Sequence, residues 1–423
     1  MEATLVSSAA KVTQLADNIQ ACARRLGQLR ASEKRMNGSR IVNDAGEKLD
    51  AEAIHDVRVN LLDACRSLLN IATGPTEMLK NMALIDKHNL ASLRVINHFQ
   101  IASLVPPDGQ ISISEIAKKC NISEEVLARI LRQAMTYEVF HEPKEGFISH
   151  TAASREIPRL SPLLSYQLDV CLPSTLSLLD WLEGERSKEH KSAFQIAHST
   201  KDTWWSYAEK RPDLIQNYGR YMALITNGGP HDVNHVVSGF AWETLGNAIV
   251  IDVGGADGFV GVALARACPH LTVIVQDSPN LKENAEAKIP SKLKNRVFFA
   301  PHSFFEPQSA MGSHADVFLL RHILHDWEDD DCLIILRHLI RCMKPSARII
   351  VAEQVFGNPG KIDKHTERTM RALDMQMMVQ FGSKERTLGD WESLFSLADP
   401  SLEIVGYIQP PGSADTLMEL RKK

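Results

Sequence analysis

The chain has 423 residues, of which 44% are hydrophobic and 23% charged, and its formal net charge is −5. This length and composition predict a globular protein of two or three domains. The negative charge disfavours nucleic-acid binding, no apolar run is long enough to cross a membrane, and the N-terminus lacks a signal-peptide pattern.

Seven cysteines are scattered along the chain without a close pair or a Cys/His cluster. Their odd number and wide spacing argue against a disulfide framework and against a structural zinc site. We therefore expect reduced thiols in a cytoplasmic protein, and no bound metal.

Helical periodicity dominates the first part of the chain. Residues 1–50 predict a polar helical extension, and residues 51–165 predict a helical domain whose pattern breaks at Gly74-Pro75. Within this domain, Leu84–Ile101 predicts a mostly buried helix. The apolar faces of these helices are larger than a monomer would expose, so we expect a homodimer formed through this region.

Residues 111–151 have the pattern of a helix, a turn, a second helix and a small β-wing around Pro143–Gly146. Such a winged-helix unit can bind DNA, but its recognition helix then carries excess positive charge. Here residues 111–140 hold four acidic and four basic side chains: Glu115, Glu124, Glu125, Glu138, Lys118, Lys119, Arg129 and Arg132. The charge balance favours a structural or dimerisation role.

The remaining residues, 166–423, predict a single catalytic domain. Residues 155–235 are helical and rich in aromatic side chains, whereas short apolar strands and helices alternate from Asn247 onward. This alternation is typical of βαβ units, and it predicts an α/β domain with a parallel, Rossmann-like sheet.

A glycine-rich turn follows the first strand of this domain. The β-branched run at 248–251 leads into Asp252–Gly258, and an apolar helix comes next. The following strand ends at Asp277, 23 residues after Gly254 (277 − 254 = 23). An acid at this place can accept hydrogen bonds from a ribose diol, so the pattern indicates an adenine nucleoside cofactor.

The glycine spacing distinguishes between two such cofactors. The dinucleotide fingerprint requires glycine at two positions that Ala256 and Phe259 occupy here. A cofactor without a pyrophosphate tolerates a looser turn, so S-adenosylmethionine is favoured over NAD. Ala256 is compatible with the turn only if its φ is negative.

Three titratable residues are predicted at the carboxyl edge of the sheet, where open α/β sheets bind their ligands. His325 follows a strand predicted over Ala315–Leu320, and Glu353 ends the strand that begins at Arg348. A later loop offers another acid, Glu385.

Several segments together resemble the class I O-methyltransferase family, which includes plant caffeic acid and flavonoid enzymes and fungal secondary-metabolite enzymes. The matching segments are DVGGADG (252–258), QD (276–277), LLRHILHDWEDDDC (319–332), IIVAEQV (349–355) and GSKERT (382–387). The resemblance implies a Rossmann-like class I methyltransferase domain behind an N-terminal all-helical, winged-helix-like dimerisation domain. It also implies that S-adenosyl-L-methionine is the cofactor.

The resemblance further implies roles for individual residues. His325 would be the general base, Glu353 and Glu385 would flank and orient it, and Asp277 would bind the ribose. Ser303 stands where the family usually has an adenosine-contacting acid. The complete cofactor set implied in this way is Asp252, Gly254, Gly255, Asp277, Ser303, Phe304 and Arg321.

Methyl transfer from a sulfonium requires mainly that an acceptor oxygen be aligned and deprotonated. A proton transfer from a phenol of pKa ~10 to a histidine of pKa ~6.5 is uphill by ~3.5 units, or roughly 5 kcal/mol. Carboxylates near His325 would stabilise the imidazolium and reduce this deficit. The expected activity is therefore O-methylation of a phenolic or enolic hydroxyl.

An apolar acceptor pocket is expected from the aromatic region and from the helix before Glu385, because Met and aromatic side chains suit a flat acceptor. The expected substrate contacts are His150, Trp205, Tyr218, Met222, Asp374, Met375 and Met378. An alternative function is a cyclisation or pericyclic step without methyl transfer, because a fold does not fix the reaction.

Overall fold

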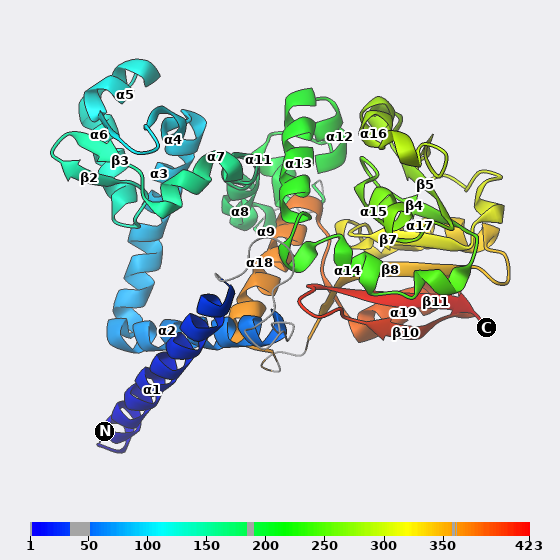
Figure 1. The fold of residues 1–423 in the computed structure, drawn as a ribbon, viewed down its shortest axis with the longest axis horizontal. Helices are drawn as coiled ribbons and strands as arrows, with labels where there is room; N and C mark the ends of the chain where they lie inside the picture. Colours follow the sequence, from blue (N-terminus) through cyan, green and yellow to red (C-terminus); the bar gives the residue numbers. More distant parts are fainter. Residues whose placement is uncertain (1, 34–50, 184–189, 358–359, 361) are drawn as a thin grey trace. The chain divides into compact units, whose positions relative to one another are not determined.

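The computed structural model describes residues 2–33, 51–183, 190–357, 360 and 362–423. These residues form two compact units: the first ends at Leu224, and the second runs from Ile225 to Lys423 and also includes residues 51–55. Figure 1 labels their elements. Among the described residues, no helix is both long and apolar enough to span a bilayer.

The first unit is almost entirely helical, as the periodicity predicts. Its strands are β1 (Gln110–Ser112), β2 (His141–Lys144) and β3 (Phe147–Ser149). Its helices are α1 (Glu2–Glu33), α2 (Ala51–Lys80), the π-helix η1 (Asn81–Asp86), α3 (Lys87–His98), α4 (Ile101–Leu104), α5 (Ile113–Cys120), α6 (Glu124–Met135), α7 (Ala152–Ser165), the π-helix η2 (Tyr166–Cys171), α8 (Leu172–Leu176), α9 (Leu178–Leu182), α11 (Ala193–Ala197), α12 (Trp204–Glu209) and α13 (Pro212–Ile225).

The first unit extends further along the chain than the boundary expected after residue 165. The helices that follow this point pack against the earlier ones, and polar contacts join them. Arg94 Nε donates to Asp169 Oδ1 at 2.6 Å, and Asn217 Nδ2 donates to the carbonyl oxygen of Pro162 at 3.1 Å. An all-helical stretch gives no change of periodicity at which a boundary could be recognised from sequence.

The predicted helix-turn-helix and hairpin are both present. Helices α5 and α6 are followed by β2 and β3, and β3 lies between β1 and β2 in a three-stranded sheet. Ser112 begins α5, because its Oγ accepts a hydrogen bond from the backbone amide of Glu115 at 3.1 Å. Fully buried Leu127, Leu131 and Ile148 belong to the core of this region.

The helical break predicted at Gly74-Pro75 is confirmed, since Gly74 has φ 75° inside α2. The expected burial of Leu84–Ile101 is only half right. Ile96 and Ile101 are fully buried, but Leu84 is 60% exposed. Two apolar residues close to Leu84 in the chain are also exposed: Leu79 is 61% exposed and Met82 is 60% exposed. We refer to Leu79, Met82 and Leu84 as the exposed apolar surface of α2 and η1.

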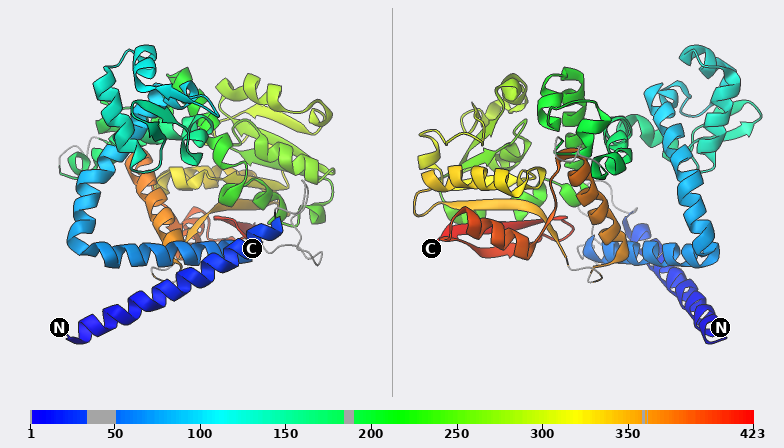
Figure 2. Two further views of the ribbon diagram at one scale, coloured as in Figure 1. Left: turned by 60° about the vertical axis from the view of Figure 1, so that its left-hand side comes forward. Right: turned by 180° about the vertical axis from the view of Figure 1, so that it is seen from behind.

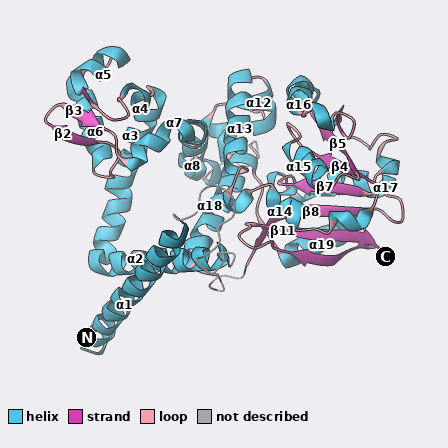
Figure 3. Ribbon diagram, in the orientation of Figure 1, coloured by secondary structure: helices cyan, strands magenta, loops and turns pink. Residues whose placement is uncertain are grey.

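The second unit contains the predicted α/β sheet, whose strands Figure 3 shows in magenta. Its strands are β4 (Ala248–Val253), β5 (Leu271–Asp277), β6 (Val297–Pro301), β7 (Val317–Arg321), β8 (Arg348–Phe356), β9 (Arg386–Thr387), β10 (Leu402–Ile408) and β11 (Asp415–Lys422). Its α-helices are α14 (Asn234–Ser238), α15 (Phe259–Ala267), α16 (Lys282–Lys288), α17 (Asp329–Cys342), α18 (Lys364–Phe381) and α19 (Leu388–Ala398). Short 3-10 turns are η3 (Gly229–His231), η4 (Trp242–Leu245), η5 (Pro279–Leu281), η6 (Ser291–Leu293), η7 (Gly312–His314) and η8 (Leu324–Asp326).

The strand order is β10-β11-β8-β7-β4-β5-β6, with the short β9 pairing β8. Strands β4 to β8 are parallel, and β11 pairs β8 antiparallel. The order reverses between β4 and β7, and a ligand site is expected at the carboxyl ends of these strands. The glycine-rich turn follows β4, and the loop that leads to His325 follows β7.

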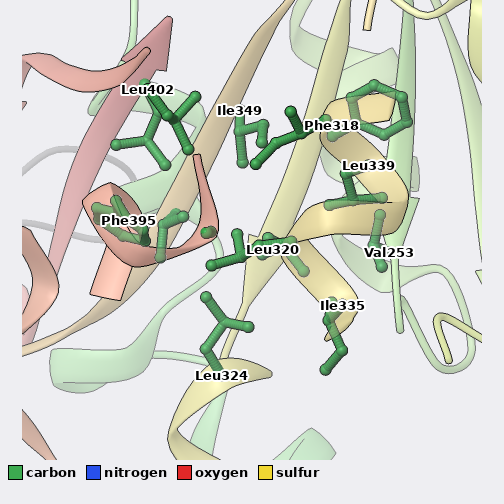
Figure 4. Close-up of a cluster of buried hydrophobic side chains, with 14 of the residues drawn as sticks. Val253, Phe318, Leu320, Leu324, Ile335, Leu339, Ile349, Phe395 and Leu402 are labelled. Atoms are coloured by element: carbon green, nitrogen blue, oxygen red, sulfur yellow. The ribbon is translucent and has the colours of Figure 1, made fainter. Parts of the chain in front are cut away.

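Two apolar cores, one on each face of the sheet, hold it between helices, as the two views of Figure 2 show. Helices α17 and α19 supply Ile335, Leu339 and Phe395 to one core, whose side chains Figure 4 shows packed against those of β7 and β8. Helices α14, α15 and α16 pack into the other core. The sheet is therefore a rigid base for the loops at its carboxyl edge.

Candidate active site

The turn after β4 requires glycine for two different reasons. Gly254 has φ 69°, a left-handed conformation that side chains disfavour. A Cβ atom on Gly255 would lie 2.5 Å from Asp252 Oδ2, so no larger residue is accommodated. The backbone amides of both glycines donate to the carbonyl oxygen of Gln276, at 2.8 and 3.1 Å, which fixes the turn against the end of β5.

Ala256 also has positive φ, 48°, which corrects the expectation of a negative value. Its backbone amide donates to Asp277 Oδ2 at 2.8 Å, and the backbone amide of Ser278 donates to Oδ1 at 2.6 Å. The bond to Asp277 holds Ala256 in its strained conformation. Asp277 thus anchors the glycine turn in addition to standing at the end of β5.

Buried polar atoms near this turn fit a charged ligand. Asp252 Oδ2 and Arg321 Nε have no hydrogen-bond partner within the described part of the chain, although both residues are buried. Burial raises the pKa of Asp252 to about 7, and it lowers the pKa of Arg321. The ammonium and carboxylate of a bound amino acid moiety would satisfy such atoms, as S-adenosylmethionine would provide.

The other predicted cofactor residues differ in how closely they approach the turn. A Cβ atom on Gly254 would lie 3.5 Å from Phe304 Cε1, so the phenyl ring lies beside the turn. Ser303 is exposed, and its Oγ accepts a hydrogen bond from the backbone amide of Phe305 at 3.3 Å. Arg321 Nη2 donates to the carbonyl oxygen of His231 at 2.6 Å.

The three residues predicted to be catalytic are brought together. His325 lies in η8, and its Nδ1 is 2.9 Å from Glu385 Oε1 and 3.8 Å from Glu353 Oε2. The other oxygen of Glu353 accepts hydrogen bonds from the backbone amides of Ile323 and Leu324, at 2.9 and 2.8 Å. Glu353 is fully buried, whereas the His325 side chain keeps 17% exposure.

The charges in this cluster make His325 a stronger base. Burial lowers the pKa of His325, but Glu353, Glu385 and Asp326 outweigh burial and hold the pKa well above its usual value. Burial also raises the pKa of Glu353 to about 7, and that of Asp326 to about 7. Asp326 Oδ1 lies 3.5 Å from His325 Nε2, so a third carboxyl group completes the cluster.

Sequence reasoning missed a residue that supports the whole turn. Arg386 follows Glu385 directly and is 1% exposed. Its guanidinium donates to the carbonyl oxygens of Leu324 and Trp327, at 2.9 and 3.0 Å, and its Nη2 donates to Asp329 Oδ1 at 2.6 Å. The GSKERT segment therefore supplies both an acid to His325 and a cation to the turn that carries it.

The chain also matches known proteins. An O-methyltransferase domain model covers residues 177–399. The chain is 59% identical over 396 residues to O-methyltransferase aoiO of Aspergillus oryzae (strain ATCC 42149 / RIB 40), with 93% of this chain and 98% of that protein covered. The chain belongs to the O-methyltransferase family.

A second curated relative agrees with this assignment, and a solved structure shares the fold. O-methyltransferase bik3 of Gibberella fujikuroi (strain CBS 195.34 / IMI 58289 / NRRL A-6831) is 33% identical over 373 residues, with 85% of this chain and 81% of bik3 covered. The crystal structure of OxaC in complex with SAH and oxaline has a TM-score of 0.80 at 20% identity, and covers 98% of this chain and 100% of that one. The predictions of the family, the fold class, the enzyme class and the cofactor S-adenosylmethionine are confirmed.

One residue expected to contact substrate has another contact in this O-methyltransferase. Asp374 lies on α18, and its Oδ1 accepts a hydrogen bond from the backbone amide of Glu385 at 3.0 Å. The carboxylate thus holds the loop that carries Glu385. On the same helix, Met375 is 42% exposed and Met378 is half-buried.

His150 was expected to contact substrate, but both of its ring nitrogens have partners in the first unit. His150 Nδ1 lies 2.9 Å from Ser154 Oγ, and Nε2 lies 3.2 Å from the carbonyl oxygen of Val105. These contacts close the β-wing, so we do not retain His150 as a substrate residue.

The remaining predicted substrate residues also belong to the first unit of the O-methyltransferase. Trp205 and Tyr218 lie in an aromatic cluster with Trp204, and their ring centroids are 5.8 Å apart in a T-shaped arrangement. Both are half-buried, as is Met222. Aromatic and sulfur side chains that keep some exposure suit contact with a flat apolar molecule.

Proposed function

We propose that this O-methyltransferase methylates a phenolic or enolic hydroxyl of a small secondary metabolite, with His325 as general base. The observation that carries the proposal is the 2.9 Å contact between His325 Nδ1 and Glu385 Oε1, with Glu353 on the same side of the ring. A histidine oriented in this way presents its other nitrogen, Nε2, to an acceptor hydroxyl.

The cofactor supplies an activated methyl group on its sulfonium sulfur. His325 Nε2 would take the proton from the acceptor oxygen, which would leave that oxygen able to accept the methyl group that the bound cofactor would supply. Glu385 and Glu353 stabilise the resulting imidazolium. Because the carboxylates raise the pKa of His325, the proton transfer from a phenol of pKa ~10 is less uphill than from an unperturbed histidine at ~6.5.

The proposed cofactor contacts follow from the geometry at the carboxyl ends of β4 and β5. Asp277 would accept hydrogen bonds from the ribose, and Phe304 would cover the adenine. Asp252 and Arg321 would bind the amino acid moiety with their buried polar atoms that have no partner among the described residues. Gly254 and Gly255 leave room for this close approach.

The proposed acceptor is flat and largely apolar. Met375 and Met378 on α18, in the same unit as His325, support this. A small-molecule acceptor is also consistent with the complex of OxaC with oxaline.

The test uses S-adenosylmethionine with an isotopic methyl label and a panel of phenolic and enolic polyketides. We expect label in the product of the wild-type enzyme, and a ~10²–10⁴-fold slower transfer in His325→Ala with binding of S-adenosylhomocysteine retained. The exposed His314 lies outside the cluster, so His314→Ala serves as the matched control. Transfer by His325→Ala at the wild-type rate, or a rearranged product without label, would contradict the proposal.

A further inference from the structure

Near the His325 cluster lies a second group of polar side chains to which the proposed reaction gives no role: buried Asp415 with half-buried His231 and His322. Asp415 Oδ2 is 2.8 Å from His322 Nε2, and Asp415 Oδ1 is 3.2 Å from His231 Nδ1. These three residues, here called the Asp415 triad, come from β11, from the loop after β7 and from η3. The side chain of Asp415 is 2% exposed.

The sheet register explains how Asp415 reaches this place. Asp415 is the first residue of β11 and lies opposite Gln354 of β8, and the next residue, Thr416, lies opposite Glu353. The preceding turn is fixed by Ser413, whose Oγ accepts from the Asp415 backbone amide at 3.0 Å and donates to the Asp415 carbonyl oxygen at 2.9 Å. Asp415 is therefore held as firmly as the base of the catalytic cluster.

Two histidines and a carboxylate could also hold a metal ion, and their ligand atoms lie within 4.8 Å of one another. The charge around them favours a different interpretation. Arg321 Nη2 lies 3.7 Å from Asp415 Oδ2 and donates to the carbonyl oxygen of His231. A guanidinium already provides the positive charge beside the carboxylate, and a divalent cation next to it would be repelled. We therefore interpret the triad as a hydrogen-bonded unit.

His322 connects the triad to the catalytic turn. Its backbone has φ 52°, a left-handed conformation that is unusual for histidine. The residues that follow it, Ile323 and Leu324, donate their backbone amides to Glu353. The His322 ring lies 5.5 Å from the His325 ring, centroid to centroid, with 30° between the planes.

We propose that Asp415 is a positioning residue for methyl transfer: through its hydrogen bond to His322, it holds the strained start of the turn that presents His325 to the acceptor. This inference rests on the proposed function. Glu353 and Arg386 bind the backbone of the turn at Ile323 and Leu324, whereas Asp415 binds the side chain of its first residue, His322. A turn held at three points keeps His325 Nε2 in line with the acceptor oxygen.

The electrostatics of the triad agree with this role. Burial lowers the pKa of His322 to about 4, so its imidazole is neutral at physiological pH. A neutral ring stacked near His325 places no competing positive charge beside the base. The charged groups that surround His322 are Asp415 on β11, His231 on η3, and Arg321 in its own segment.

The experiment separates the side-chain bond from the backbone strain. His322→Gly relieves the left-handed strain but removes the donor. His322→Gln keeps the strain, and its terminal amide nitrogen lies about where Nε2 does, so it can still donate to Asp415. Asp415→Asn removes the charge with little change of shape. Glu419→Gln is the matched control, because it removes a charge from the same strand, where Glu419 pairs with Arg348.

We expect Asp415→Asn and His322→Gly to lower kcat at least ~10-fold, with binding of S-adenosylhomocysteine within about threefold of wild type. His322→Gln and Glu419→Gln should retain kcat within about threefold. In NMR spectra, the His325 Nδ1 proton resonance should shift in Asp415→Asn but not in Glu419→Gln. If Asp415→Asn does not fold, His231→Gln, which removes only one partner of the carboxylate, should show the same changes more weakly.

Wild-type kcat in both Asp415→Asn and His322→Gly, together with an inactive His325→Ala, would overturn the positioning role and leave the proposed function intact. Wild-type transfer by His325→Ala would instead overturn the proposed function. Thermal stabilisation of the wild type by added Zn²⁺, lost in His231→Gln, would show a metal site and overturn our interpretation of the triad. An equal loss of kcat in Glu419→Gln would also overturn it, because the effect would then be general to the strand.

Discussion

His325 Nδ1 and Glu385 Oε1 lie 2.9 Å apart, although 60 residues separate them in the chain. This contact occupies Nδ1 and leaves Nε2 for an acceptor in the proposed mechanism, in which the Glu385 carboxylate stabilises the positive charge on the ring. The pH dependence of activity should therefore depend on this pair.

The rate of methyl transfer should rise with pH, and the midpoint of this rise in the pH–rate profile should lie above pH 6.5. Only the neutral imidazole accepts a proton, and the surrounding carboxylates raise the pKa of His325 well above its usual value. Glu385→Gln removes a negative charge that stabilises the protonated His325 ring. The midpoint of the rise should therefore move to lower pH, and the maximal rate of methyl transfer should fall. The profile of kcat/KM measures both effects, and an unchanged midpoint in Glu385→Gln would contradict the assignment.

The cofactor site should depend on Asp277. We expect Asp277→Ala to weaken binding of S-adenosylhomocysteine at least tenfold, or about 1.4 kcal/mol, because charge-assisted hydrogen bonds are worth ~1.5–3 kcal/mol. The variant also loses the bond that holds Ala256 at positive φ. Calorimetry of Asp257→Asn provides a control, since Asp257 is on the same turn but pairs with Asn284. Equal affinity in Asp277→Ala and wild type would show that the cofactor lies elsewhere.

Sequence patterns predicted the parts of this site that depend on local order. Strand, glycine turn and helix follow one another closely, so Gly254, Gly255 and Asp277 could be placed at the correct edge of the sheet. His325 and Glu353 follow from the same rule, because the carboxyl ends of parallel strands meet. The role of Glu385 came from the family resemblance.

Contacts between distant segments could not be predicted in this way. Arg386, Asp374 and Asp415 all support the catalytic turn, but periodicity shows which face a residue occupies and not which partner it meets. The conformation of Ala256 was also missed, since the backbone angle depends on its bond to Asp277. The division at Leu224 lies within continuous helical pattern, where sequence gives no boundary signal.

Arg386 should be essential for the stability of the second unit. Arg386→Met removes the charged donor from the carbonyl oxygens of Leu324 and Trp327, which keep the weaker Cys332 thiol as a donor. Hydrogen bonds to charged groups are worth about 1.5–3 kcal/mol each. We expect a loss of about 2–4 kcal/mol in the free energy of unfolding, measured with urea. Arg421→Met removes an exposed guanidinium and should change the free energy by less than about 0.5 kcal/mol. If both variants lost the same free energy of unfolding, the hydrogen bonds from Arg386 to the turn would not be what stabilises the second unit.

The Asp415 triad should make stability fall at mildly acidic pH. His322 has its pKa lowered to about 4 in the folded protein, against ~6.5 when unfolded, so the unfolded chain binds more protons between these values. The contribution of neutral His322 to the free energy of unfolding is complete above pH 6.5 and is lost as the pH falls toward 4. At pH 5 the free energy of unfolding should be lower by about 2 kcal/mol for this reason. Urea unfolding at pH 7 and pH 5 should show a smaller difference in His322→Asn than in wild type. A difference of the same size would assign the acid sensitivity to other groups.

The exposed apolar surface of α2 and η1 should be a homodimer interface. Leu79, Met82 and Leu84 are each at least 60% exposed, which is unfavourable for a monomer. Light scattering at micromolar concentration should give twice the mass of the chain for wild type, and the single-chain mass for Met82→Glu combined with Leu84→Glu. Leu397→Glu changes an equally exposed leucine of the second unit, 64% exposed, and should leave the dimer intact. A monomeric wild type would exclude the interface.

The consecutive placement of Glu385 and Arg386 has a consequence for how activity is gained and lost. In the proposed mechanism Glu385 stabilises the charge on His325, and its neighbour Arg386 donates to the turn that carries His325. A displacement of residues 382–387 by a few ångströms would therefore remove both supports in a single event. The population of molecules would then divide into competent and inert forms, without a graded series of weakened ones between them.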